Sequence, residues 1–511
     1  MPSTGIATTI DLFGEDLLEN IIARLPASSF ASAACVNRSW NLVSDRILCR
    51  PKLSSAWSIN PSLQVAVEDV ANKVLLEPIR PHFAIVFVGR ILDKQQAHQL
   101  ITAKLGSKVP VITNWSRGII GRDVISDEFR EIDWKTNDRD ADTSVLVMEY
   151  VNRAIMLIVG FLPGIKVKIV SLPKQTEAPQ AVVIDKFVTD IREFSASISG
   201  CKSPSAIIMF SEIQGDAIPV LEKLDYALSP ETVIVGDCYP FLRHDNRSSR
   251  NIKATEEHAS AAALVFVVDR NKPPGIGEIQ FDAVISNGLL TVGDAYKVAS
   301  VKEGRYESLS LLTARREGSR EILDGETIKN QIYEELGHPN YLRPFCIGVR
   351  KRRKCSIGQE KVGWVTSFSF HQVRRSDEEG LIVDDRGIKT GDTFRYYYSD
   401  FATALSSAAN VSNDLRSLKQ GSNTGGDKRE VFGGLIFTSS SFCDTFFTQP
   451  KICRAPFTDN FPGVTLGGSC SYQAIGRGDL ILHVKDSQEQ KMGRCCLPKC
   501  SAVYFIMSYT P

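Results

Sequence analysis

The stretch IDLFGEDLLENIIARLPASSFASAACVNRSWNLVSDRIL (10–48) decides the first part of the fold. Leu17, Ile21 and Leu25 recur every fourth residue, which predicts a helix with a broad apolar stripe. Pro26 ends this helix, because its ring cannot sit in a helix interior, and later apolar residues at helical spacing predict two more short helices. Units of about 40 residues rarely fold stably alone. The stretch therefore predicts a docking module whose apolar face is completed by a partner protein.

This stretch resembles the F-box pattern L-P-x-x-L-L-x-x-I-L-x-x-L-P, followed by V-C-x-x-W. Phe13 and Gly14 stand at the first Leu and first Pro positions, so the first Pro of the pattern is missing. The resemblance implies an F-box over 10–55 that binds the Skp adaptor and, through it, the cullin scaffold of a ubiquitin ligase. An ordinary N-terminal helical cap packed on its own domain is the alternative. The residues that the resemblance assigns to adaptor binding are Phe13, Gly14, Leu17, Leu18, Ile21, Ile22, Leu25, Pro26, Val36 and Trp40.

The composition is that of an ordinary globular protein. The chain has 511 residues, 43% hydrophobic and 23% charged, with a formal net charge of +1. It lacks the basic field that attracts nucleic acid and the apolar run of about 20 residues that spans a membrane. The N-terminus also shows no secretory signal. We therefore expect a cytoplasmic or nuclear protein without nucleic-acid or membrane partners, whose twelve cysteines are free thiols.

After about residue 80 the hydrophobic pattern of the sequence changes. HFAIVFVG (82–89) is a continuous apolar run, typical of a strand buried on both faces, and runs of this kind alternate with amphipathic helices. We predict a multidomain chain in which the all-α three-helix F-box precedes two domains with mixed sheets, an α/β domain over 80–302 and a strand-rich α+β domain over 305–511. No leucine-rich unit recurs at a fixed period.

Three further segments carry a second resemblance. They are VPVITNWSRGIIG (109–121), VFGGLIFTSSSFCD (431–444) and FPGVTLGGSCSYQAIG (461–476). They resemble the FIST N-terminal and C-terminal domain pair of signal-transduction proteins, although the Arg and Glu usual in the C-terminal motifs are absent. This resemblance implies that the two large domains once sensed a small, amino-acid-like ligand and could still bind one.

The turn-like segment Trp115, Ser116, Arg117 and Gly118 is a candidate ligand or substrate loop. Consecutive backbone N–H groups in such a turn can surround an anionic group. A plain glycine turn between two elements is the alternative.

A basic run covers 350–354, and two more arginines follow near 374. Runs of this kind act as nuclear import signals or contact acidic protein surfaces. A solvated hairpin loop is the alternative interpretation. The candidate contacts for an acidic or phosphorylated partner are Arg350, Arg352, Arg353, Arg374 and Arg375.

The cysteines do not indicate a zinc site or a nucleophilic thiol. Cys495, Cys496 and Cys500, with His483 upstream, form one cluster rather than the two paired knuckles of a structural zinc site. Cys443 has no histidine near it in sequence, so inert packing is favoured over a nucleophile. We expect no metal, no cofactor and no catalytic residue.

Together these patterns predict the non-catalytic substrate-recognition subunit of a Skp–cullin–F-box ubiquitin ligase, with an unknown protein substrate. The alternative is a small-molecule sensor whose F-box controls its own turnover.

Overall fold

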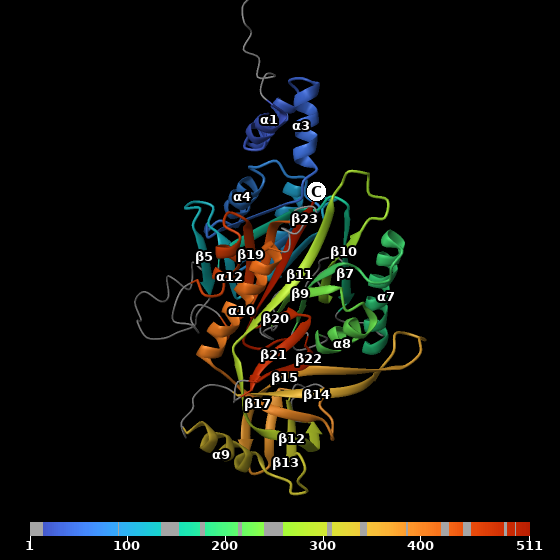
Figure 1. Ribbon diagram of the computed structural model, residues 1–511, viewed down its shortest axis with the longest axis vertical. Helices are drawn as coiled ribbons and strands as arrows, with labels where there is room; N and C mark the ends of the chain where they lie inside the picture. The colour runs from blue at the N-terminus through green and yellow to red at the C-terminus, as the bar shows by residue number, and fades with distance from the viewer. Residues whose placement is uncertain are drawn as a thin grey trace, which may run out of the picture.

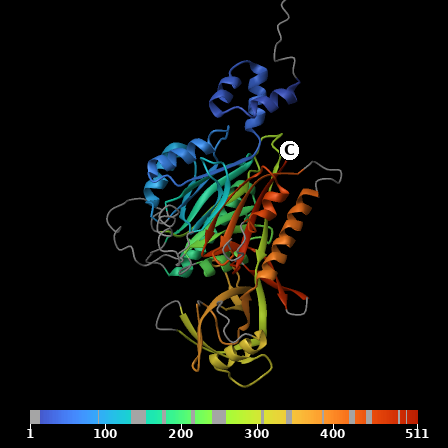
Figure 2. The ribbon, with the colours of Figure 1, turned by 90° about the vertical axis from the view of Figure 1, so that its left-hand side faces the viewer.

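In this computed structural model three N-terminal helices project from one end of a sheet-rich body, and a second group of strands forms the other end (Figures 1 and 2). The residues that the structure describes are 14–89, 91–133, 153–173, 179–212, 217–239, 259–303, 309–337, 345–384, 387–420, 429–442, 451–484, 488–495 and 497–511.

The predicted three-helix unit is confirmed as α1 (Glu15–Ile22), α2 (Ala27–Ala34) and α3 (Arg38–Leu48). The side chain of Asn37 caps α3 by accepting a hydrogen bond from the Trp40 N–H at 2.8 Å. A four-stranded sheet begins directly afterwards, at β1 (Lys52–Ser58).

The first sheet of the body has the order β1-β6-β2-β3, in which only β2 and β3 are parallel. Two helices pack on its outer face and bury a separate apolar cluster there. The elements of this unit after β1 are α4 (Leu63–Val74), β2 (Phe83–Val88), α5 (Lys94–Leu105), β3 (Val111–Trp115) and β6 (Ile155–Phe161).

The second sheet repeats this topology. Its order is β7-β10-β8-β9, and again only the pair β8–β9 is parallel. The helices again lie on the outer face. The elements are β7 (Ile165–Pro173), α7 (Gln180–Ser199), β8 (Ala206–Glu212), α8 (Ala217–Ala227), β9 (Val233–Tyr239) and β10 (Ala259–Val268).

A third copy comes from the other end of the chain. The strands run in the order β11-β23-β18-β19, with β18–β19 as the parallel pair. The body is therefore three copies of one β-α-β-α-β-β unit. The elements of the third copy are β11 (Glu278–Asn287), α10 (Phe401–Gln420), β18 (Glu430–Ser439), α12 (Ala455–Asn460), β19 (Thr465–Ser471) and β23 (Ser501–Thr510).

Exchanged strands join the copies. β4 (Gly118–Arg122) leaves the first copy to pair with β19 of the third, and β20 (Gln473–Gly476) leaves the third to pair with β9 of the second. Both exchanged strands join at the same register, and Ile-Gly-Arg occurs at both places, at 120–122 within β4 and at 475–477 at the end of β20. β5 (Phe129–Asp133) extends the third sheet beyond β4.

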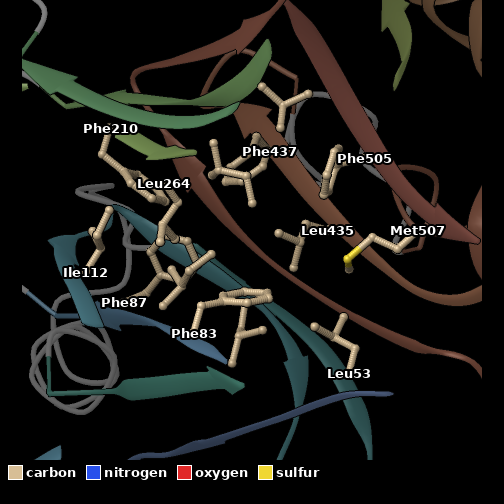
Figure 3. Packing of buried hydrophobic residues seen from close by; sticks show 14 of the residues in the cluster. Leu53, Phe83, Phe87, Ile112, Phe210, Leu264, Leu435, Phe437, Phe505 and Met507 are labelled. Carbon is tan, nitrogen blue, oxygen red and sulfur yellow. The ribbon is translucent and has the colours of Figure 1, made fainter. Parts of the chain in front are cut away.

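The inner faces of the three sheets share one apolar core (Figure 3). At its centre lie Phe87, Phe210 and Phe437, which occupy equivalent positions on the middle strands of the three copies. The ring of Phe210 lies 5.9 Å from that of Phe87 and 6.2 Å from that of Phe437. Burial of this shared face is what holds the three sheets together.

A six-stranded barrel is inserted into the third copy, between β11 and α10. The strands close in the order β12-β13-β16-β15-β14-β17, and α9 covers side chains that fill the interior. The elements are β12 (Leu289–Glu303), β13 (Leu309–Arg316), α9 (Gly325–Leu336), β14 (Cys346–Cys355), β15 (Gly363–Asp377), β16 (Gly380–Asp384) and β17 (Thr393–Ser399), with β21 (Gly478–Val484) and β22 (Gln488–Cys495) bridging β12 to β15 outside it.

The predicted α/β region with mixed sheets is thus confirmed. The sequential division into 80–302 and 305–511 does not coincide with these sheets, because β12 belongs to the barrel and β11 pairs with the last strand of the chain. Cys443 lies outside the described residues. Within the described part of the chain, no helix is long and apolar enough to cross a membrane.

Candidate functional site

The three N-terminal helices enclose a core of four buried side chains, Leu18, Ile22, Phe30 and Val43. Leu25 and Trp40 pack against this core and are partly exposed. These positions are internal because residues three and four apart share one face of each helix.

The other predicted adaptor contacts point outward. Leu17 and Ile21 lie one turn apart on α1 and are 46% and 44% exposed, and Val36 is 60% exposed. Leu42 on α3, which was not predicted, is 57% exposed. Large apolar side chains therefore remain in water on α1, on α3 and in the segment between α2 and α3.

The remaining predicted contacts are placed at the helix ends. Gly14 precedes α1 and accepts the hydrogen bond of the Leu17 N–H at 3.0 Å, and Pro26 precedes α2 and is exposed. Phe13 lies outside the described residues. The predicted residues thus separate into an inner set that holds the helices together and an outer set that is available to a partner.

Few contacts attach the helices to the body. The Ala27 N–H donates to the Leu76 carbonyl at 2.8 Å, and Arg80 lies 3.6 Å from Asp45. Both contacts involve α2 or α3 rather than the outer face of α1. Figure 2 shows the three helices standing clear of the sheets, so a partner can reach α1 without displacing the body.

Ion pairs link α1 to α3 and to the residues just after α3. Arg46 lies 3.2 Å from Glu15 and 3.7 Å from Glu19, and Arg50 lies 2.9 Å from Glu19. Exposed pairs of this kind contribute little free energy. The orientation of α1 therefore depends mainly on the small apolar core.

The second candidate, Trp115 to Gly118, is a tight turn between two strands. β3 ends at Trp115 and β4 begins at Gly118. Ser116 is buried, and its Oγ lies 3.1 Å from the Cys470 carbonyl, which also accepts the Arg117 N–H at 3.0 Å. The Gly118 N–H donates to Ser116 Oγ at 3.3 Å. These two N–H groups are therefore already hydrogen-bonded within the chain.

Beside this turn lies a polar centre that the sequence analysis missed. Asn114, Asp237 and Ser469 are the strand partners of the three central phenylalanines, so each copy contributes one of them. Asn114 Nδ2 donates to Asp237 Oδ1 at 2.9 Å, and Ser469 Oγ donates to Asp237 Oδ2 at 2.5 Å. One fully buried carboxyl group thus links all three sheets.

Burial raises the pKa of Asp237 to about 7, although the hydrogen bonds from Ser469 and Asn114 act in the opposite direction. Burial also raises the pKa of the neighbouring Cys238 thiol. The signal available in the sequence was one polar residue near the end of an apolar run in each of the three copies. This signal points to a shared site only when the equivalent strands of the three copies are aligned with one another.

The basic run is not the solvated hairpin loop that was the alternative interpretation. Residues 350–354 lie within strand β14, where side chains alternate between faces, and Lys351 is buried. Of the predicted acidic-partner contacts, three are already in ion pairs: Arg353 with Asp392, Arg374 with Asp384 and Arg375 with Asp377. Arg350 and Arg352 remain exposed.

The described residues hold no group of three or more metal-ligating side chains. Cys500 is buried, and its thiol lies 3.2 Å from the Ser441 carbonyl. Cys496 lies outside the described residues, and the side chains of Cys495 and His483 are not described.

Comparison with known proteins bears on the helical unit. Residues 10–50 match the F-box domain. The chain is also 40% identical over 507 residues to the F-box/LRR-repeat protein At5g63520 of Arabidopsis thaliana, covering 98% of this chain and 94% of that protein.

The chain belongs to the F-box protein family.

The matched residues of this F-box protein contain both the small core and the exposed apolar side chains described above. The name of the Arabidopsis relative includes leucine-rich repeats. In the part of this chain that the structure describes, the region after the F-box consists of three sheets and a barrel, not of a leucine-rich solenoid.

Proposed function

We propose that this F-box protein is the substrate-recognition subunit of a Skp–cullin–F-box ubiquitin ligase. The observation that carries the proposal is the exposure of Leu17 and Ile21 on α1, within a unit whose own core cannot cover them. An adaptor that buries this face would complete the core in the manner of a helix in a groove. The proposed role implies a cytoplasmic or nuclear location.

In this role the chain contributes no catalytic group. It holds a substrate near the ubiquitin-conjugating enzyme, which raises the effective concentration of the reacting groups. The well-packed body suits that task, because a rigid scaffold holds its surface in a fixed geometry.

The test uses the full-length chain with Leu17→Asp and Ile21→Asp as a substrate trap. The variant should no longer bind the adaptor but should still bind a substrate protein that the ligase ubiquitinates. That substrate should accumulate in cells that express only the variant. Retention of the adaptor by the variant would contradict the proposal. The proposal would also be contradicted if the wild-type chain recovered only ligase components and no substrate protein.

The polar centre supports a second candidate, a small-molecule sensor with FIST-like domains whose F-box controls its own turnover. Asn114, Asp237 and Ser469 meet where the parallel strand pairs of three copies converge, a common place for ligands in α/β proteins. Screening amino acids by thermal shift tests this candidate. The sensor candidate requires a ligand that stabilises the wild type and not an Asp237→Asn variant. It fails if no amino acid has this effect.

A further inference from the structure

One face of the β14–β15 hairpin carries a row of cations and an exposed tryptophan. Antiparallel pairing sets Lys354 opposite Trp364 and Arg352 opposite Thr366. Residues directly opposite each other share a face, and so do alternate residues of one strand. Arg350, Arg352, Lys354 and Trp364 therefore lie on the same side of the hairpin.

Trp364 is 57% exposed, which is unusual for so large an apolar side chain. The guanidinium carbon of Arg352 lies 4.9 Å from the centre of its ring, and Nζ of Lys354 lies 5.6 Å away. These cation–π contacts hold the ring beside the charges. The face thus offers an apolar surface and positive charge at the same place.

Within the described part of the chain, the cations on this face are not paired with acidic side chains. Among the side chains that the structure describes, no carboxylate lies within 4.0 Å of Arg350, Arg352 or Lys354. On the opposite face, Arg353 is paired with Asp392, at 2.9 and 2.5 Å. The two faces of one strand therefore differ: one has its charge satisfied inside the fold and the other presents it to solvent.

The hairpin is held rigidly. Its tip runs beside α7 and α8 (Figure 1), where the Gly358 N–H donates to Asp185 at 3.1 Å and Lys223 donates to the Ser356 carbonyl at 3.0 Å. Arg192 lies 3.0 Å from Glu360, and Ser367 Oγ donates to Glu222 at 3.0 Å. A fixed surface loses little conformational entropy when a partner binds.

We propose that the face formed by Arg350, Arg352, Lys354 and Trp364, the cationic hairpin face, binds an acidic segment of the recruited substrate. This inference rests on the proposed function and adds the chemical class of the substrate. Neighbouring cations on the face are two residues apart, about 6.8 Å along the strand. That spacing matches alternate residues of an extended peptide, so the segment carries an anionic group at every second position.

Both glutamate and phosphoserine supply such groups. The probes are therefore two fluorescent peptides of one length, with glutamate or phosphoserine at alternate positions. A third peptide has the glutamates of the first in one block. Binding to the full-length chain is measured by anisotropy at a fixed, near-physiological salt concentration. An alternating peptide should bind at least several times more tightly than the blocked one, and the tighter of the two alternating peptides identifies the anionic group.

The test variant carries Arg350→Glu, Arg352→Glu and Lys354→Glu. The matched control carries Lys108→Glu, Lys302→Glu and Arg320→Glu, which are exposed, lie on other elements and change the net charge equally. We expect the test variant to lose about tenfold or more in affinity for the alternating peptides, the control to change little, and Trp364→Ala to lose a smaller factor.

Equal affinity of the test variant and the control would overturn the inference. It would also be overturned if a single-stranded oligonucleotide of equal charge bound as tightly as the peptides and were released by the same three changes. All substituted residues are exposed, so the variants should melt like the wild type. Adaptor binding should be normal in all of them, which separates failure of this inference from failure of the proposed function.

Discussion

The F-box and the three-copy body use apolar residues in opposite ways. The F-box buries Leu18, Ile22, Phe30 and Val43 and leaves Leu17 and Ile21 in water. The body directs the apolar faces of three sheets into one shared core. Apolar content alone therefore does not distinguish a docking unit from a scaffold. The distinction lies in whether a unit can cover the apolar surface that its own sequence produces.

The largest expected effect separates the two regions completely. Changing Leu17 and Ile21 to Asp should weaken adaptor binding by at least about a hundredfold, because two charges would be buried without partners. The melting temperature of the body should not change. The measurement is affinity for the purified Skp adaptor by titration calorimetry.

A matched control for that variant changes Ile125 and Val182 to Asp. These residues are 86% and 56% exposed and belong to the body. If the control loses the adaptor as the F-box variant does, the docking face does not lie on α1.

Core substitutions should affect only the region that contains them. Phe30→Ala removes a buried ring from the F-box, and Phe437→Ala removes one from the centre of the body. Each should cost about 3 kcal/mol or more. The small F-box should then unfold locally and lose the adaptor. The body variant should melt earlier and still bind the adaptor when it is folded. Calorimetric melting with and without adaptor distinguishes these outcomes. If both variants lost adaptor binding and the stability of the body together, the two regions would not be separate.

The polar centre predicts how stability depends on pH. Because the pKa of Asp237 is raised from 3.8 to about 7 on folding, the native state keeps a proton that the unfolded chain releases above about pH 4. Stability should therefore fall as pH rises from about 4 to about 7, by on the order of 4 kcal/mol, and change no further from this group above pH 7.

Asp237→Asn should remove this part of the pH dependence, since an amide can keep both hydrogen bonds with a rotated Ser469 hydroxyl. Urea unfolding at several pH values measures the difference between wild type and variant. A constant difference between pH 4 and pH 7 would show that Asp237 does not titrate as described.

The smallest effect concerns the surface of the F-box. Arg46→Ala removes the exposed pairs with Glu15 and Glu19. It should cost less than about 1 kcal/mol of F-box stability and change adaptor affinity only slightly. A loss of adaptor affinity as large as that of the Leu17 and Ile21 variant would mean that ion pairs, rather than the apolar core, set the position of α1.

Local patterns in the sequence predict much of this structure. The F-box helices follow from the spacing of Leu17, Ile21 and Leu25, because contacts three and four residues apart form within one helix. The strand at 82–89 follows from a continuous apolar run. The outer and inner sets of F-box residues could not be separated in this way, since that depends on how three helices pack.

Long-range pairing is what the sequence does not reveal. The third copy joins β11 to β23 across nearly half of the chain, with the barrel between them, so local alternation indicates two consecutive domains instead. The role of Asp237 depends on the same pairing. The basic run at 350–354 was also misleading, because five consecutive cations hide the two-residue alternation of a strand.

The most direct test of the account is hydrogen exchange of the full-length chain with and without the Skp adaptor. The account predicts that protection increases over α1, α2 and α3, most strongly over α1 around Leu17 and Ile21, while exchange in the three sheets and the barrel is unchanged. Protection that appears in the body while α1 continues to exchange as in the free chain would contradict it.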